Sequence, residues 1–405
     1  MSTRSTSPSK ILQLQIERLV HRGLGMARIE GKAVFIPAVI PGEFVRIEIE
    51  EDRTSYATAK AIEIINPSPF RIQPACPYFL DCGGCQLAHI SYEQQLVLKK
   101  EVCKETLVRL ARFDPGSAMS EPLPSPSAFN YRSRARFLVQ RGKLGFRAWQ
   151  TQTLVQVADC LLLKDELRHA LPALQELIAQ FPGQKDFEVE MDLDPDSGEI
   201  HALVLARKKI FYRYDNGLFR IIEPPPKTML RLLSFTQANP GQNEKLVELV
   251  SALAANSRAA ACLELFAGAG NFSFALAKKM NRIVAVEQNQ NAVSLAKLVA
   301  KEKQTENVEF VARTAESYLN QALQHKSRFE LVLLDPPRAG AKKESAQIMR
   351  LKPKSIIYVS CEPSTLARDL KFLADAGYRL EKLIPIDLFP QTFHLESISL
   401  LTRAA

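Results

Sequence analysis

A cysteine and a glutamate near the end of the chain are of the types that covalent catalysis uses. Cys361 follows the apolar run Ile356–Val359 and Ser360, so it stands where a predicted buried strand ends. Cysteines that are merely structural more often lie inside such a run. Glu396 stands in "FPQTFHLES", two residues after His394 and just before the last apolar run. A thiolate can form a covalent intermediate, and a carboxylate or an imidazole can serve as the general base.

Three further features follow apolar runs and together predict a nucleoside ligand. "LELFAGAGNF" contains Gly268 and Gly270, which allow a sharp turn and a close approach of the backbone to a ligand. The third glycine of the dinucleotide fingerprint is absent, which argues against NAD and FAD. Glu287 ends the next run, where an acidic residue accepts hydrogen bonds from ribose hydroxyls, and Asp335 ends a third. S-adenosylmethionine, which has no diphosphate, is the candidate cofactor.

A methyl donor beside a strand-end thiol indicates methylation of a carbon atom. An amine attacks with its own lone pair, whereas C5 of a pyrimidine becomes nucleophilic only after a thiolate adds to C6. The C5 proton must then be removed, which requires a base within reach. Amine-methylating enzymes usually place an aromatic residue after a motif like Asp335-Pro336-Pro337, but Arg338 stands there instead. Methylation of an exocyclic amine is therefore disfavoured.

The scaffold for these residues is predicted by the alternation of strand-like and helix-like runs after about residue 240. This pattern is typical of the α/β class with a doubly wound parallel sheet, that is, a Rossmann-like domain. Ligands bind at the carboxyl edge of such a sheet, near the point where the strand order reverses. The last two runs, 381–390 and 396–402, have no helix between them and predict an antiparallel edge.

The first part of the chain has a different pattern. Residues 11–65 form short alternating runs broken by glycines, which predict a small five-stranded β-barrel of the OB-like kind, a common platform for nucleic acids. The start of the chain is short and polar, no apolar run is long enough to cross a membrane, and no secretory signal is evident. We therefore expect a cytoplasmic protein that has no membrane partner and is a monomer.

A basic stretch within the central part predicts contact with RNA. The chain carries a formal charge of +9, and residues 131–147 contain six basic residues and no acidic residue. Arg132, Arg134 and Arg136 alternate, so in a strand they share one face. Tyr131, Phe137 and Phe146 lie among them, and aromatic rings can stack on unpaired bases. The alternative is that this strand has an ordinary solvated face.

Three cysteines with close spacing predict a metal site. Cys76, Cys82 and Cys85 have the spacing C-x5-C-x2-C on a glycine-rich segment. A cytosolic chain is not expected to use them in disulfides, and clustered thiolates bind soft metal centres. Zinc and a [4Fe–4S] cluster each need a fourth ligand. The spacing differs from the C-x3-C-x2-C of radical enzymes, so a radical role is disfavoured.

The ordered set of motifs resembles the RNA 5-methyluridine methyltransferases, in the TRAM-domain, iron–sulfur-containing branch. The resemblance covers nearly the whole chain and is carried by "FTQAN", "ELFAGAGNF", "VEQN", "LLDPPRAG", "VSCEP" and "FPQTFHLES". It implies that Cys361 is the nucleophile and Glu396 the base. It further implies that S-adenosylmethionine is held by Gln237, Phe266, Asn271, Glu287 and Asp335.

The same resemblance implies the remaining assignments. Cys160 becomes the fourth cysteine ligand, and a [4Fe–4S] cluster is favoured over zinc. The expected domains are a disordered tail (1–10), a TRAM barrel (11–65), a central α+β RNA-binding domain (66–235) and the methyltransferase domain (236–405). The expected activity is transfer of a methyl group to C5 of a uridine in RNA, with rRNA favoured over tRNA.

Other functions remain open. A non-catalytic iron–sulfur RNA-binding or assembly factor would not need both Cys361 and Glu396. An iron–sulfur electron-transfer protein would have no use for the glycine loop, Glu287 and Asp335. An RNA cytosine-C5 methyltransferase typically has a second cysteine in a Pro-Cys motif near the aspartate, where this chain has Pro336 followed by Pro337.

Overall fold

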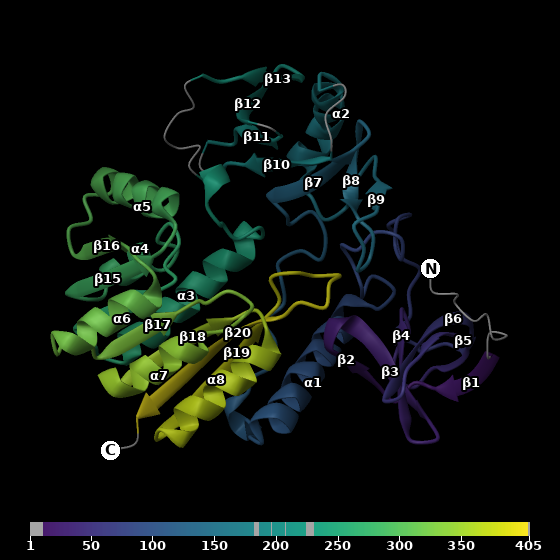
Figure 1. Cartoon of the computed structure of the whole chain (residues 1–405), viewed down its shortest axis with the longest axis horizontal. Helices are drawn as coiled ribbons and strands as arrows, with labels where there is room; N and C mark the ends of the chain where they lie inside the picture. The colour runs from purple at the N-terminus through teal and green to yellow at the C-terminus, as the bar shows by residue number, and fades with distance from the viewer. Residues whose placement is uncertain (1–10, 182–185, 196, 207, 224–230, 404–405) are drawn as a thin grey trace. The chain divides into compact units, whose positions relative to one another are not determined.

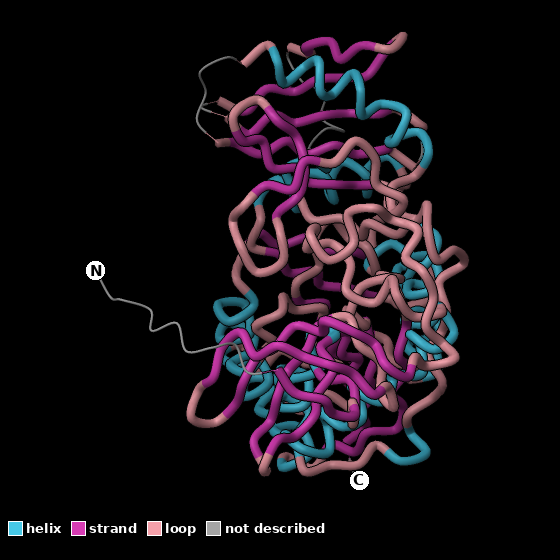
Figure 2. The backbone as a smooth tube through the Cα atoms, turned by 90° about the vertical axis from the view of Figure 1, so that its right-hand side faces the viewer, coloured by secondary structure: helices cyan, strands magenta, loops and turns pink. Residues whose placement is uncertain are grey.

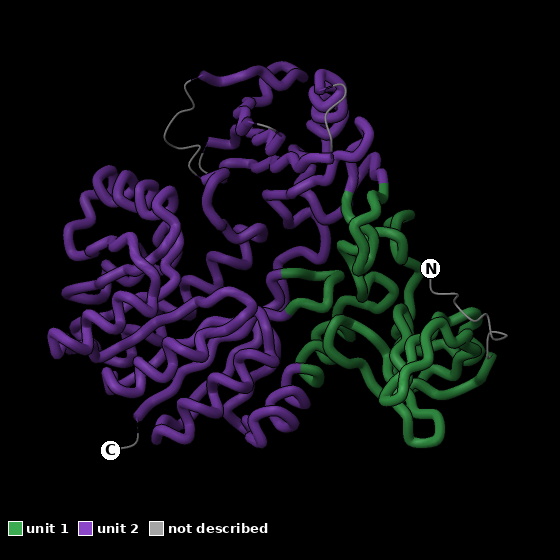
Figure 3. Tube along the Cα trace, in the orientation of Figure 1, with its two compact units in different colours: residues 1–102, 146–155, 389–394 green, residues 103–145, 156–388, 395–405 purple. Residues whose placement is uncertain are grey.

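The computed structural model describes residues 11–181, 186–195, 197–206, 208–223 and 231–403. The tail predicted at residues 1–10 lies outside these ranges. By its internal contacts the chain divides into two compact units, 1–102 with 146–155 and 389–394, and 103–145 with 156–388 and 395–405 (Figure 3). The predicted boundaries at residues 65 and 235 stay a prediction. None of the helices in the described ranges has the length and hydropathy of a membrane-crossing segment.

The N-terminal sheet has six strands in the order β1-β5-β6-β4-β3-β2, one more than predicted. The extra strand arises because the run 12–20 changes partners midway: the Ile16 amide donates to the Glu43 carbonyl, and the Glu17 amide donates to the Met26 carbonyl. The strands are β1 (Ile11–Gln15), β2 (Arg18–Val20), β3 (Leu24–Ile29), β4 (Lys32–Pro37), β5 (Phe44–Asp52) and β6 (Tyr56–Asn66), with a short 3-10 turn at His21–Gly23.

A second sheet is antiparallel in all its strand pairings that the structure describes, in the order β13-β12-β11-β10-β7-β8-β9. Its strands lie side by side in the tube view (Figure 2). They are β7 (Arg134–Gln140), β8 (Lys143–Arg147), β9 (Leu154–Gln156), β10 (Phe187–Leu193), β11 (Ile200–Leu205), β12 (Lys209–Asp215) and β13 (Leu218–Ile221).

The third sheet confirms the predicted α/β domain. Its order is β16-β15-β14-β17-β18-β20-β19, with parallel pairing from β16 to β18 and antiparallel pairing of β20 with β18 and β19 (Figure 1). The strand order reverses between β14 and β17. The strands are β14 (Ala261–Leu265), β15 (Arg282–Glu287), β16 (Val308–Ala312), β17 (Leu331–Leu334), β18 (Ser355–Ser360), β19 (Tyr378–Ile386) and β20 (Glu396–Arg403).

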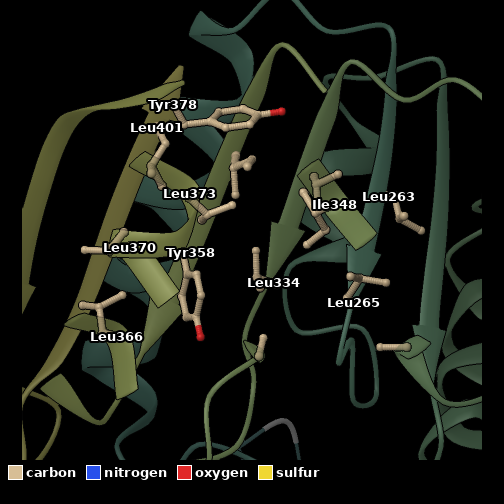
Figure 4. Packing of buried hydrophobic residues seen from close by; sticks show 14 of the residues in the cluster. Leu263, Leu265, Leu334, Ile348, Tyr358, Leu366, Leu370, Leu373, Tyr378 and Leu401 are labelled. Carbon is tan, nitrogen blue, oxygen red and sulfur yellow. The ribbon is translucent and has the colours of Figure 1, made fainter. Parts of the chain in front are cut away.

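Helices pack on this sheet through apolar faces. In α8, Leu366, Leu370 and Leu373 have helical spacing and lie in one buried cluster with Tyr358 and Leu334 of the sheet (Figure 4). The helices are α1 (Tyr92–Ala111), α2 (Asp165–Ala179), α3 (Pro240–Asn256), α4 (Ser273–Ala277), α5 (Gln290–Glu302), α6 (Ala315–Gln324), α7 (Lys342–Leu351) and α8 (Pro363–Asp375), with a 3-10 turn at Gly116–Ala118. This packing fixes the strand ends that carry the candidate site.

Candidate active site

Cys361 lies in a two-residue turn between a strand and a helix. Strand β18 ends at Ser360 and helix α8 begins at Pro363. The helix starts there because the Glu362 side chain caps it, accepting hydrogen bonds from the Ser364 amide at 3.2 Å and the Ser364 hydroxyl at 2.7 Å. Proline at the first helical position is suited to this start. The thiol is thereby held at the carboxyl edge of the sheet.

Glu396 is brought to the same edge by antiparallel pairing. Ser360 of β18 pairs with Ser397 of β20, and the Ser397 hydroxyl donates to the Ser360 carbonyl at 3.2 Å. Cys361 follows the first serine and Glu396 precedes the second, so both lie at one end of two neighbouring strands. Asp335 follows β17, which pairs with β18 in parallel and therefore ends at this edge too. The structure thus brings the predicted nucleophile, base and aspartate together.

The Cys361 thiol is protonated in the free protein at neutral pH. Burial raises its pKa to about 12, and the negative charges of Glu396 and Asp335 add to this effect. The positive charge of Arg338 acts in the opposite direction. These influences place the two carboxyl groups and the guanidinium around one sulfur atom. A reactive thiolate must therefore form when substrate is present, rather than being stored beforehand.

The two carboxyl groups share an environment that favours protonation. Burial raises the pKa of Asp335 to about 7. Burial and then the charge of Asp335 raise the pKa of Glu396 well above its ordinary value, while Arg338 opposes the rise. Glu396 is 3 % exposed, and its Oε1 has no hydrogen-bond partner among the described residues. A buried carboxylate of raised pKa is a strong base once ionised, as removal of a proton from carbon requires.

Two ionisable residues of the site were not predicted from the sequence. Arg338 was noted only as a departure from an amine-methylating motif, yet its charge acts on both Cys361 and Glu396. Glu264, inside β14, is 1 % exposed and accepts a 2.5 Å hydrogen bond from the Ser273 hydroxyl. Burial, with a contribution from Asp335, raises the Glu264 pKa to about 8. Glu264 could have been identified from the sequence, because it is a carboxylate within an otherwise apolar strand-like run.

The glycine loop after β14 is open at one of its two glycines and faces an acidic side chain. Phe266 adopts a left-handed conformation with φ of 61°, which is uncommon for a residue with a side chain. A Cβ atom on Gly268 would meet no heavy atom within 4 Å, whereas one on Gly270 would lie 2.7 Å from the Phe274 ring. Glu287 faces this loop and accepts a hydrogen bond from the Gly268 amide at 3.1 Å. Open space beside an acidic acceptor fits the ribose of a nucleoside cofactor.

Gln237, another of the predicted cofactor residues, follows a segment that is held by Arg134. This guanidinium donates hydrogen bonds to the carbonyls of Arg231, Leu232 and Ser234 and to the Thr236 hydroxyl, at 2.8 to 3.0 Å. Gln237 follows directly on this segment.

Asn271 is fixed separately from the Gln237 segment. It exchanges two side-chain hydrogen bonds with Asn243 of α3, at 2.9 and 3.0 Å.

The prediction that Arg134 contacts RNA is therefore wrong. Arg134 is 9 % exposed and pairs with the buried Glu190 at 3.0 Å, so its charge is already satisfied inside the domain. Tyr131 and Phe137 are likewise buried and cannot stack on a base. Arg136 has a side chain that is 54 % exposed, and the half-buried Arg132 donates to the Arg134 carbonyl at 2.8 Å. Arg132 and Arg136 remain predicted RNA contacts.

Three of the predicted metal ligands line one pocket of the first unit. Cys76, Cys82 and Cys85 share a pocket of about 720 Å³ with Phe79 and Trp149. The Gly84 amide points at the Cys82 sulfur at 3.4 Å, a contact that suits a thiolate. Within the described ranges, no three histidine, cysteine or carboxylate side chains are grouped as ligands of a metal ion.

The fourth predicted ligand, Cys160, belongs to the second compact unit. It is half-buried, and its amide donates to the Asp159 carboxylate at 2.7 Å. The type of donor therefore fits a soft metal centre, and the assignment of the four ligands stays a prediction.

Comparison with known proteins places this arrangement in a family. Residues 229–404 match the family described as tRNA (uracil-5-)-methyltransferase, and residues 8–62 match the TRAM domain. A structure of the Pyrococcus abyssi tRNA (uracil-54, C5)-methyltransferase in complex with S-adenosyl-L-homocysteine has the same fold, with a TM-score of 0.70 at 22% identity, covering 96% of this chain and 100% of that one.

Relatives with higher sequence identity span the chain. The chain is 33% identical to the 23S rRNA (uracil(1939)-C(5))-methyltransferase RlmD of Vibrio parahaemolyticus over 96% of each protein. It is 31% identical to an uncharacterized RNA methyltransferase of Aquifex aeolicus, over 97% of this chain and 98% of that protein. This protein therefore belongs to the family of RNA uracil-C5 methyltransferases.

Proposed function

We propose that this protein transfers a methyl group from S-adenosylmethionine to C5 of a uridine in 23S rRNA. The observation that carries the proposal is the meeting of Cys361, Glu396 and Asp335 at the carboxyl edge of the third sheet, beside the open glycine loop. The preference for 23S rRNA over tRNA rests on the relatives named RlmD, which align with this chain from end to end.

We assign each protein-dependent step of the reaction to a residue of this site. The Cys361 thiolate adds to C6 of the uracil, and the electron pair of the C5–C6 double bond makes C5 nucleophilic. Bound S-adenosylmethionine would supply the methyl group: as the bond to C5 forms, the sulfur–methyl bond would break and S-adenosylhomocysteine would be left. Glu396 then takes the C5 proton, the double bond re-forms, and the C6–sulfur bond breaks to release Cys361. The raised pKa of Glu396 suits this proton transfer from carbon.

Cofactor binding is assigned to residues around the glycine loop. Glu287 would accept hydrogen bonds from the ribose hydroxyls, because its carboxylate already faces the loop through the Gly268 amide. Phe266, Asn271 and Gln237 would hold the rest of the cofactor, and Asp335 would contact both cofactor and target base. The uridine must leave its stack to reach Cys361, as in other enzymes that act on a base. Arg132 and Arg136 are the proposed contacts to the RNA backbone.

A [4Fe–4S] cluster on Cys76, Cys82, Cys85 and Cys160 completes the proposal. Its role would be structural, and no catalytic step passes through it. Anaerobically purified protein should contain iron and acid-labile sulfide in equal amounts, and Cys85→Ser should lose both. Cys103→Ser is the matched control, because this thiol is buried on α1, does not line the cysteine pocket and should leave the iron content unchanged when replaced. Stoichiometric zinc in place of iron would contradict the cluster assignment.

The activity is tested on RNA from a deletion strain by nucleoside mass spectrometry. Loss of 5-methyluridine from 23S rRNA, restored by the wild-type gene and not by Cys361→Ala, is the expected result. Loss from the tRNA fraction would correct the substrate, and loss of 5-methylcytidine would correct the target base. Purified Cys361→Ala should bind S-adenosylhomocysteine yet form no covalent adduct with 5-fluorouridine RNA. An adduct that persisted in this variant would identify another nucleophile.

A further inference from the structure

A long connection leads directly into the proposed base. Strands β19 and β20 pair antiparallel, with Ile386 opposite Glu396, yet the connection between them runs through residues 387–395. Tight hairpins need only about two to five residues. The middle of this connection, residues 389–394, is counted with the unit of residues 1–102 rather than with its own sheet. We call residues 389–394 the base loop.

Two buried glutamines join the base loop to helix α1. The Gln95 side chain donates to the Gln391 side-chain oxygen at 2.9 Å and accepts from the Gln391 amide at 3.0 Å. Gln95 has no solvent exposure and Gln391 is 3 % exposed. Gln95 also donates to the carbonyls of Leu87 and Ile90, at 3.1 and 2.9 Å. One side chain therefore joins α1, the base loop and the segment that follows Cys85.

Backbone contacts hold the same loop from a second side. The Gln391 carbonyl accepts hydrogen bonds from the amides of Gln86 and Leu87, at 3.0 and 2.9 Å. Lys99 of α1 donates to the Phe389 carbonyl at 3.1 Å. Gln391 adopts a left-handed conformation with φ of 69°, which a residue other than glycine maintains only when its surroundings impose it. These contacts hold the base loop in one conformation.

Glu396 depends on this backbone placement. Its Oε1 has no hydrogen-bond partner among the residues that the structure describes, so no hydrogen bond within these residues orients that oxygen. On its C-terminal side the residue is fixed by the pairing of Ser397 with Ser360. On its N-terminal side the chain comes from the base loop through Leu395. The position of the Glu396 carboxylate therefore depends on how firmly the backbone is held on both sides of this residue.

We propose that Gln95 is a positioning residue for Glu396, acting through its exchange of hydrogen bonds with Gln391. Gln95 touches no reacting atom in this assignment. The proposal rests on the proposed function, because it assigns to Glu396 the removal of the C5 proton. That step comes after Cys361 has bonded to C6 and after the methyl group has been transferred. A misplaced base therefore slows the release of enzyme from RNA and leaves the earlier steps intact.

The test uses two variants, one of which removes both hydrogen bonds of the exchange and the other only one. Gln95→Met keeps the length of the side chain and removes all of its hydrogen bonds. Gln391→Gly removes the bond from Gln95 to the Gln391 side-chain oxygen, keeps the contacts of the Gln391 backbone and suits the positive φ. Gln94→Met is the matched control, since it makes the same change one residue earlier on α1. Each protein is first checked by thermal unfolding and by titration with S-adenosylhomocysteine.

The decisive readout is the fraction of enzyme bound covalently to ordinary uridine-containing rRNA during turnover, measured on denaturing gels. Both variants should turn over about tenfold more slowly, bind S-adenosylhomocysteine with unchanged affinity and accumulate the covalent complex. The control should match the wild type. Slow turnover without accumulation, or wild-type turnover in both variants, would overturn the assignment of Gln95. Failure of the wild type to form an adduct with 5-fluorouridine RNA would instead overturn the proposed function itself.

Discussion

Arg134 donates a hydrogen bond of 2.8 Å to the backbone carbonyl of Ser234, three residues before Gln237. The same guanidinium reaches the carbonyls of Arg231 and Leu232 and the Thr236 hydroxyl. An arginine in the central sheet thereby shapes the segment that enters the cofactor region. Planar guanidinium groups can serve several acceptors at once, which an ammonium group cannot do in the same geometry.

Arg134→Lys should therefore weaken cofactor binding. We expect the dissociation constant for S-adenosylhomocysteine to rise about tenfold, equivalent to about 1.4 kcal/mol, measured by isothermal titration calorimetry. Arg136→Lys is the control, because its side chain is 54 % exposed and lies on the same strand. Equal affinities for the two variants would contradict a role of Arg134 in holding this segment.

The alkylation of Cys361 should depend steeply on pH. With its pKa raised to about 12 by burial and by nearby carboxylates, the thiolate fraction increases about tenfold for each pH unit from 7 to 9. The rate of carbamidomethylation of the Cys361 peptide, followed by mass spectrometry, should rise without a plateau in this range. The alkylation rate of free glutathione in the same tube should instead level off as the pH passes the pKa of its thiol. A plateau for Cys361 below pH 8 would mean that the thiol is activated before substrate binds.

Because Glu264 is protonated in the folded protein, the free energy of unfolding should decrease as the pH rises. Its folded-state pKa of about 8 exceeds the ordinary value of 4.5, so between these values the folded protein retains a proton that the unfolded chain has released. Stability then falls with increasing pH across this window. Glu264→Gln stays neutral, so its melting temperature relative to the wild type should increase by a few degrees from pH 5 to pH 8.5.

The matched control for this experiment is Glu330→Gln. Contacts with the Ala260 amide and Lys354 lower the pKa of Glu330, so its contribution is lost only below this range. The difference in melting temperature between this variant and the wild type should stay constant from pH 5 to pH 8.5. If the difference in melting temperature between Glu264→Gln and the wild type also stayed constant over this range, Glu264 would be ionised in the folded protein.

Asn243 should support the cofactor loop through Asn271. The two amides exchange hydrogen bonds of 2.9 and 3.0 Å, which orient the Asn271 side chain at the start of α4. Asn243→Ala should raise the dissociation constant for S-adenosylhomocysteine about threefold to fivefold, since one net hydrogen bond contributes about 1 kcal/mol. Lys245→Ala, on the same helix and facing Glu248, should leave the affinity unchanged. An unchanged affinity for Asn243→Ala would show that the Asn243–Asn271 pair does not contribute to cofactor binding.

Local sequence determined the scaffold of the third sheet and the identity of its edge residues. The alternation of apolar runs and helical runs predicted the parallel sheet, and the last two runs predicted the antiparallel edge that β19 and β20 form. Cys361 and Asp335 were predicted because polar residues that follow parallel apolar strands meet at the carboxyl edge of the sheet. Glu396 instead begins the antiparallel last strand, and its role was implied by the motif "FPQTFHLES". The order of apolar runs along the chain is sufficient for the first inference.

Side-chain burial and long-range partners were decided only by the tertiary structure. Alternation predicted one shared face for Arg134 and Arg136, and both guanidinium groups pair with Glu190. The additional hydrogen bonds to the 231–236 segment bury Arg134, whereas the Arg136 side chain stays 54 % exposed. The exchange between Gln95 and Gln391 joins residues 296 positions apart. Gln391 lies in the motif "FPQTFHLES", but nothing in that motif identifies Gln95 as its partner. The six-stranded first sheet likewise depends on the partner change at Ile16. Such contacts are decided by which segments the completed fold brings together, because a hydrogen bond needs both of its groups in place and each local sequence specifies only one.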